Sequence, residues 1–161
     1  MPRESNSAPA AGPLAEAVAL ARANESFLAQ LNEMLRRAEA NVLAADPTCR
    51  ACGRCCHFDE REHRLYVSTG ELALLAADPP PACPPGRCPY QQGALCTARP
   101  RRALGCRTFY CDRSVQDHSN AIYESAHQAI RRLHDQHGIP YHYVELTAAL
   151  PNTFPPLSQA R

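Results

Sequence analysis

The chain has 161 residues, enough for one domain and short for two independent cores, and its net charge of +1 excludes a strong pull toward nucleic acid or an anionic membrane. All 17 basic residues are arginine, which excludes lysine Schiff-base chemistry and a phosphate-binding P-loop. Trp is absent and aromatic residues make up only 6% of the chain, so we expect a small core that needs reinforcement.

The N-terminal segment is a poor signal peptide, because Glu4, Glu16 and Glu25 interrupt its apolar residues. No run approaches the roughly 20 apolar residues that cross a bilayer. We therefore expect a cytoplasmic, bacterial-type protein that does not contact a membrane. In a reducing compartment, clustered cysteines more often bind metal or perform redox chemistry than form disulfides. The odd total of nine cysteines also argues against a fully paired disulfide framework.

Residues 1–12 are rich in Ala, Ser and Pro and are predicted to form a disordered tail. A long amphipathic helix is predicted over 13–46, because neither Pro nor Gly occurs between Pro13 and Pro47, with an interruption at Asn24. Its apolar stripe repeats every seven residues, at Leu14, Ala21, Leu28, Leu35 and Val42. Such a stripe packs on the rest of the chain or forms a seam with a second copy or a protein partner.

Residues 47–150 are predicted to form the cysteine-rich domain. A short strand is expected at His63–Val67, and Ser68 with Glu71 fits a capping box that starts a short central helix. Prolines between 79 and 89 indicate an extended linker.

The region from Cys83 to Cys111 has no helical period and is predicted to be irregular. A C-terminal helix is expected from Val115 to His137, ending at Gly138. One short turn over 144–150 and a tail at 151–161 complete the chain. The predicted fold class is therefore mostly α, with an irregular cysteine-rich metal-binding core, a long N-terminal helix, a short central helix and a C-terminal helix.

The first cysteine cluster has the spacing CxxCxxCC and consists of Cys49, Cys52, Cys55 and Cys56. A CxxC step allows two sulfurs to converge on one metal across a tight turn, and Gly53 supplies the permissive backbone for that turn. Three sulfurs at this spacing, with a fourth from elsewhere, are typical of ferredoxin-type iron–sulfur binding.

The second cluster supplies Cys88, Cys96, Cys106 and Cys111, with Cys83 nearby. Eight cysteines suit two four-thiolate sites, or one cubane cluster with four spare thiols. Arginines beside the cysteines would stabilise them as anions; the candidates are Arg50, Arg54, Arg99 and Arg107.

The order of these motifs, CxxCxxCC followed by a Glu-containing helix and then CPY, RP and CRTFYC, resembles the YkgJ-type cysteine-cluster family. That family is described as a zinc- or iron-chelating domain, and the resemblance covers roughly half of the chain. It implies that the metal ligands are Cys49, Cys52, Cys55, Cys56, Cys88, Cys96, Cys106 and Cys111. The gap from Arg101 to Gly105 is longer than is usual in the family, and Cys83 is additional.

Among the histidines, only His57 lies inside a cysteine cluster, where it is an alternative to one thiolate. His127 and His134 share a face of the last helix; either they approach the cluster or they are ordinary polar or half-buried residues. No nucleophile elbow, dinucleotide loop or zinc-protease motif is present, so no catalytic residue is assigned.

The sequence thus predicts a metal-binding protein that holds an iron–sulfur cluster, of the 4Fe–4S type before others, with Zn²⁺ as the alternative metal. A redox role or support of a modification reaction would follow from such a cluster. One alternative is a structural zinc module in which the helix over 13–46 binds a partner protein or forms a homodimer. Another is an iron–sulfur enzyme with an open ligand position.

Overall fold

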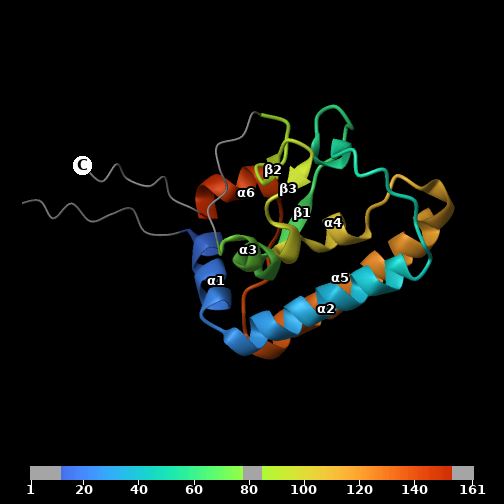
Figure 1. Ribbon diagram of the computed structural model, residues 1–161. Coiled ribbons are helices and arrows are strands. Elements are labelled where there is room, and N and C mark those ends of the chain that lie inside the picture. The colour runs from blue at the N-terminus through green and yellow to red at the C-terminus, as the bar shows by residue number, and fades with distance from the viewer. Residues whose placement is uncertain (1–11, 78–84, 154–161) are drawn as a thin grey trace, which may run out of the picture.

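A computed structural model describes residues 12–77 and 85–153 and is mostly helical in these ranges (Figure 1). The α-helices are α1 (Pro13–Arg22), α2 (Glu25–Leu43), α3 (Thr69–Leu75), α4 (Leu104–Thr108), α5 (Gln116–His137) and α6 (Leu146–Thr153). The strands are β1 (Tyr66–Ser68), β2 (Gln91–Gln92), β3 (Leu95–Cys96) and β4 (Tyr143–Glu145). Single 3₁₀ turns occur at Arg54–Cys56, Arg99–Arg101 and Arg113–Val115.

The helix predicted over 13–46, with its interruption at Asn24, forms as two helices, α1 and α2, which are separated at Ala23 and Asn24, and α2 ends at Leu43. Asn24 has extended backbone angles, and its side chain accepts a hydrogen bond from the Phe27 N–H at 2.9 Å. It is therefore the N-cap of α2, which is a stronger role than the predicted interruption. The cap turns α1 away from α2, and Figure 1 shows the two helices meeting at an angle.

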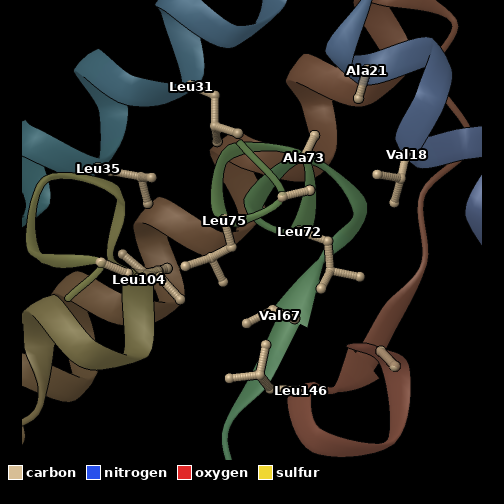
Figure 2. Close-up of a cluster of buried hydrophobic side chains, with 14 of the residues drawn as sticks. Val18, Ala21, Leu31, Leu35, Val67, Leu72, Ala73, Leu75, Leu104 and Leu146 are labelled. Carbon is tan, nitrogen blue, oxygen red and sulfur yellow. The ribbon is translucent and has the colours of Figure 1, made fainter. Parts of the chain in front are cut away.

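The apolar stripe of these two helices packs on the rest of the chain. Its fully buried members include Ala21, Leu35 and Val42, and α1 and α2 contact α3, α4, α5 and α6. Figure 2 shows the side chains of Leu31 and Leu35 from α2 gathered with those of α3 and α4 around the buried core. The stripe thus packs on the rest of the chain, which is the first of the two roles predicted for it.

Helices α2 and α5 lie side by side in opposite directions (Figure 1). Asn24, at the start of α2, is hydrogen-bonded to His137, at the end of α5. At the other end of the pair, the His118 ring lies 3.2 Å from the Asn41 carbonyl oxygen. The predicted C-terminal helix is confirmed, and it ends at Gly138 in the left-handed conformation, with φ of 63°.

The predicted capping box is present in full at the start of α3. The Ser68 hydroxyl accepts the Glu71 N–H, and Glu71 Oε2 accepts the Ser68 N–H at 2.7 Å. The second oxygen of the same buried carboxylate accepts the Leu104 N–H at 2.7 Å. Glu71 therefore closes the first turn of α3 and also fixes the start of α4, a second role that the sequence pattern did not indicate.

Strand β1 begins three residues later than the predicted strand and pairs antiparallel with β4, with Val67 opposite Val144. The sequence predicted only a turn in this later region, whereas it forms β4 and then α6. Residues 151–153, predicted as tail, belong to α6 and extend the folded part of the chain past the boundary at residue 150. The predicted tail over 1–12 and the linker at 79–89 fall largely outside the described residues, as does Cys83.

The region around the second cysteine cluster is more regular than predicted. Strands β2 and β3 form a hairpin in which Gln91 is opposite Cys96, and α4 contains Cys106. None of the helices in the described ranges is long and apolar enough to cross a membrane.

Candidate metal centre

The first cysteine cluster lies on a tight turn whose shape depends on Gly53. This residue has φ of 72°, and the 3₁₀ turn that contains Cys55 and Cys56 follows it directly. A Cβ at position 53 would lie 2.8 Å from Gln91 Nε2 and 3.1 Å from the Ala94 backbone. Only glycine combines a positive φ with the absence of a Cβ, so the predicted role of Gly53 as the permissive residue of this turn is confirmed.

Two hydrogen bonds join this turn to the second cluster. The Gln91 side chain donates to the Gly53 carbonyl at 2.7 Å, and the Cys88 N–H donates to the Cys56 carbonyl at 2.8 Å. Because Gln91 pairs with Cys96 across the β2–β3 hairpin, these bonds bring the hairpin cysteine to the same place. The two clusters are thus held together by backbone geometry.

Five of the eight predicted ligands interact through their side chains, and we call these the inner thiols: Cys55, Cys56, Cys88, Cys96 and Cys106. Cys55 is hydrogen-bonded to Cys56, and Cys56 is hydrogen-bonded to Cys88. Cys96 and Cys106 lie close enough for their charges to act on one another and on Cys56. The inner thiols come from three separate stretches of the chain, and none of them is in a disulfide.

Crowding makes the inner thiols hard to ionise in the absence of a cation. The hydrogen bond to Cys56, together with burial, raises the pKa of Cys55 far above its usual range. The hydrogen bond from Cys55 lowers the pKa of Cys56, but the bond to Cys88, burial and the charges of Cys88 and Cys96 outweigh it and raise this pKa to about 11. Burial, followed by the charges of Cys56 and Cys96, raises the pKa of Cys106 to about 12. A bound cation reverses this repulsion and deprotonates coordinating thiols.

The other three predicted ligands are Cys49, Cys52 and Cys111, which we call the outer thiols; they are exposed, as is Cys55 of the inner group. The chain segments of two of them meet, because the Thr48 N–H donates to the Asp112 carboxylate at 3.0 Å. Over residues 12–77 and 85–153, no three Cys, His, Asp or Glu side chains are grouped as a metal site. The inner thiols therefore interact with one another through Cys56, but in the described ranges they are not grouped to hold a metal ion.

One of the four arginines expected beside the thiols has a different role. Arg107 is 4% exposed, and its Nη1 donates to Glu39 Oε2 of α2 at 2.8 Å. Its Nε donates to the Arg102 carbonyl, and its Nη2 donates to the Pro100 carbonyl. Each nitrogen of this guanidinium thus donates to an oxygen acceptor, and the side chain fastens the segment before Cys106 to α2.

The arginine whose charge acts on the inner thiols is Arg102, which lies two residues before α4. Its positive charge lowers the pKa of both Cys55 and Cys106 against the opposing effects of burial and neighbouring thiols. Its guanidinium also pairs with Glu39. Neither Glu39 nor Arg102 was among the residues that the sequence predicted to act at the site. The run Arg99-Pro-Arg-Arg offered a local signal for Arg102, whereas only the packing of α2 on α4 reveals Glu39.

The three histidines that the sequence singled out are engaged with groups other than the thiols, whereas the His63 ring lies 3.0 Å from the Cys55 carbonyl oxygen. His57 Nδ1 lies 3.0 Å from Glu60 Oε2, so this ring nitrogen faces a carboxylate. His127 is hydrogen-bonded to Tyr141, and His134 is buried against Phe27 in the core. The reading of His127 and His134 as ordinary polar or buried residues is the one the structure favours.

Comparisons with protein-family models, curated proteins and solved structures found no match to this chain. The resemblance to the YkgJ-type family therefore stays a prediction, and the argument for function depends on the residues themselves.

Proposed function

We propose that this chain is a cysteine-cluster metal-binding protein that holds an iron–sulfur cluster through the inner thiols. The observation that carries the proposal is that thiols from three stretches of the chain interact with one another, although the described side chains are not grouped to hold a metal ion. Cysteines from the first turn, the β2–β3 region and α4 are in mutual contact or charge interaction, with no disulfide among them. Neighbouring thiols with raised pKa values stay protonated in the absence of a cation, and a bound metal would take them as thiolates.

The donor type fits a thiophilic metal. The interacting group is composed entirely of sulfur, and the neighbouring His57 is paired with Glu60. Cys55 and Cys56 are adjacent in the chain, which is unusual for a simple zinc ligand pair. This adjacency, together with the CxxCxxC spacing, favours an iron–sulfur cluster, with electron transfer, redox sensing or support of a modification reaction as its use. Free thiols of this kind favour the reducing cytoplasm.

Metal binding should be coupled to folding of the cysteine-rich region. The β2–β3 hairpin has two residues in each strand, and α4 has five residues, so neither element is stable by itself. The bonds that join them to the first turn involve the same residues that carry the thiols. A metal that fixes the thiols would therefore also fix these short elements.

The first experiment is purification of the whole chain without air, followed by a visible absorption spectrum and assays of iron, zinc and acid-labile sulfide. A brown protein with stoichiometric iron and sulfide supports the proposal. A colourless protein with one or two zinc ions supports the structural alternative instead. A reduced, folded protein with neither metal overturns both.

A pair of variants assigns the ligands. We expect Cys106→Ser to lose most of the bound iron and sulfide, because Cys106 is half-buried and interacts with Cys56 and Cys96. The matched control is Cys111→Ser, which changes an exposed outer thiol five residues later. Equal metal loss in the two variants would contradict the assignment to the inner thiols.

A further inference from the structure

A cavity of about 490 Å³ opens on the surface next to the cysteine turn. Its volume is in the range of small-molecule binding sites, which measure a few hundred Å³. The lining comes from the short stretch of chain between the cysteine turn and β1, and it combines aromatic rings with charged groups: Phe58, Asp59, Glu62, His63, Arg64 and Tyr66. The cavity is therefore separate from the inner thiols.

Backbone hydrogen bonds hold this stretch in shape. The Asp59 N–H donates to the Gly86 carbonyl at 3.1 Å, and the His63 N–H donates to the Phe58 carbonyl at 3.1 Å. Gly86 has φ of 80°, and a Cβ at this position would collide with the Asp59 carboxylate. Glu62 has φ of 52°, a left-handed conformation that residues other than glycine rarely adopt. The turn thus places both acidic residues at the cavity before any ligand arrives.

The His63 ring supplies a further acceptor. Its Nε2 lies 3.0 Å from the Cys55 carbonyl oxygen, and this nitrogen carries the hydrogen because a carbonyl oxygen only accepts. Nδ1 of the neutral ring is therefore an acceptor. Phe58 and Phe109 contact the ring, with centroids 5.5 Å and 5.8 Å away, and fix its plane. The cavity thus combines three acceptor groups with aromatic walls.

The charge of the lining favours a cation. The carboxylates of Asp59 and Glu62 outnumber the single guanidinium of Arg64. Neither carboxylate is part of an ion pair within residues 12–77 and 85–153. Aromatic faces also attract cations. Among the cations of proteins and metabolites, a guanidinium is planar, stacks on aromatic rings and donates paired N–H bonds to a carboxylate, whereas an ammonium is a compact point charge.

We propose that this cavity is a binding site for a guanidinium group, which stacks on the aromatic wall and donates N–H bonds to Asp59 and Glu62. The group belongs either to an arginine side chain of a protein partner or to a small guanidino compound, and the recognition chemistry is the same for both. The site does not depend on whether the thiols hold a metal, so it can fail or hold independently of the proposed function.

The test is titration calorimetry of the whole chain, purified without air, with Nα-acetylarginine amide as the probe. The matching lysine amide carries the same charge on an ammonium and should bind at least about threefold more weakly. Asp59→Asn and Glu62→Gln should each weaken binding of the arginine amide about fivefold, because each removes one charged acceptor. The control Glu60→Gln changes an exposed carboxylate that pairs with His57 and is not part of the lining, so its affinity should stay within about twofold of the wild type. Arg64→Gln removes the opposing charge and should bind at least as tightly as the wild type.

A wild-type chain that does not bind the arginine amide overturns the inference, as does equal affinity for the arginine and lysine amides. A loss in Glu60→Gln as large as in Asp59→Asn would mean that diffuse surface charge is responsible and would also overturn it, as would weaker binding by Arg64→Gln. Circular dichroism checks the fold of each variant, and where Asp59→Asn does not fold, Glu62→Gln decides. A second titration with agmatine, a small guanidino amine, identifies the source of the group. Tighter binding of agmatine than of the arginine amide supports a small guanidino compound, and weaker binding supports an arginine side chain of a partner.

Discussion

The substitution Arg107→Met tests whether the buried guanidinium fastens the cysteine-rich region to α2. It removes an ion pair to Glu39 and two hydrogen bonds to backbone carbonyls from a side chain that is 4% exposed. Breaking a buried ion pair costs about 3–5 kcal/mol, mainly because the remaining charge loses its partner. Glu39 keeps its contact with Arg102, so the lower end applies, and we expect a loss of about 3 kcal/mol.

Urea unfolding of the reduced protein as purified, followed by far-ultraviolet circular dichroism, measures this loss. With a denaturant slope of about 2 kcal/mol per molar, the midpoint should fall by about 1.5 M. Arg99→Met changes an exposed arginine nearby and should cost less than about 0.5 kcal/mol. A loss below about 1 kcal/mol for Arg107→Met would mean that the Arg107–Glu39 pair contributes no more than an exposed salt bridge. That result would refute the conclusion that the buried guanidinium fastens the cysteine-rich region to α2.

Four further predictions concern the turn, the capping box, the core and the metal. Gly53→Ala should destabilise the protein by about 1–3 kcal/mol, and by more than the control Gly93→Ala. Both positions have positive φ, but only a Cβ at position 53 would also meet the backbone of a neighbouring segment. Equal losses of the free energy of unfolding in urea would show that this backbone contact does not matter. Glu71→Ala should cost about 2–4 kcal/mol in the same assay, since it leaves two buried N–H groups without an acceptor, and a loss below 1 kcal/mol would contradict this. Burial lowers the pKa of His134 below the usual histidine value of 6.5, so the unfolded chain takes up a proton below pH 6.5 before the native protein does. The contribution of His134 to the free energy of unfolding is therefore fully present above pH 6.5 and falls as the pH is lowered, by up to about 1.4 kcal/mol per pH unit. Comparing the free energy of unfolding at several pH values, His134→Phe should have a shallower dependence than the wild type, and an identical slope would refute the assignment. Removing the metal with a chelator should abolish amide-exchange protection in α4 and the β2–β3 hairpin while the α2–α5 pair keeps most of its own, whereas unchanged protection would contradict the coupling of metal binding to folding.

The features that the sequence predicted well are those specified by a few neighbouring residues. Ser68 and Glu71 form their capping box because both partners lie within one helical turn. Gly138 ends α5 and Gly53 shapes the cysteine turn, since each adopts a backbone conformation that other residues rarely take. Asn24 marked the interruption correctly, but its role as the N-cap of α2 was not predicted. A single Asn within an apolar repeat is equally compatible with a local irregularity in one helix and with a cap between two helices.

The features that the sequence did not predict depend on residues far apart in the chain. Strand β4 pairs with β1 across more than 70 residues of sequence. Each strand has three residues, which is too short for an alternation of apolar and polar residues to predict the pairing. The division into inner and outer thiols is of the same kind. Cys49 and Cys55 belong to one CxxCxxC motif and both are exposed, yet the folded chain places the second against Cys56. Motif spacing gives candidate ligands, and the packing of α4 and the hairpin decides which of them meet.

The Glu39 carboxylate explains why the metal centre and the helix pair should behave as one unit. It is the acidic partner of both Arg102 and Arg107, so it offsets two positive charges at the base of the cysteine region. Without this carboxylate, the two guanidiniums would lose their shared acidic partner and repel each other in the metal-free protein. In the metal-loaded protein, thiolates near Arg102 would supply negative charge in its place. Glu39→Gln should therefore destabilise the metal-free protein more than the metal-loaded protein, because bound thiolates supply part of the missing negative charge. The difference between the two forms in urea unfolding measures how far α2 and the metal compensate the same arginines, and an equal loss in both forms would show that Glu39 acts through packing alone.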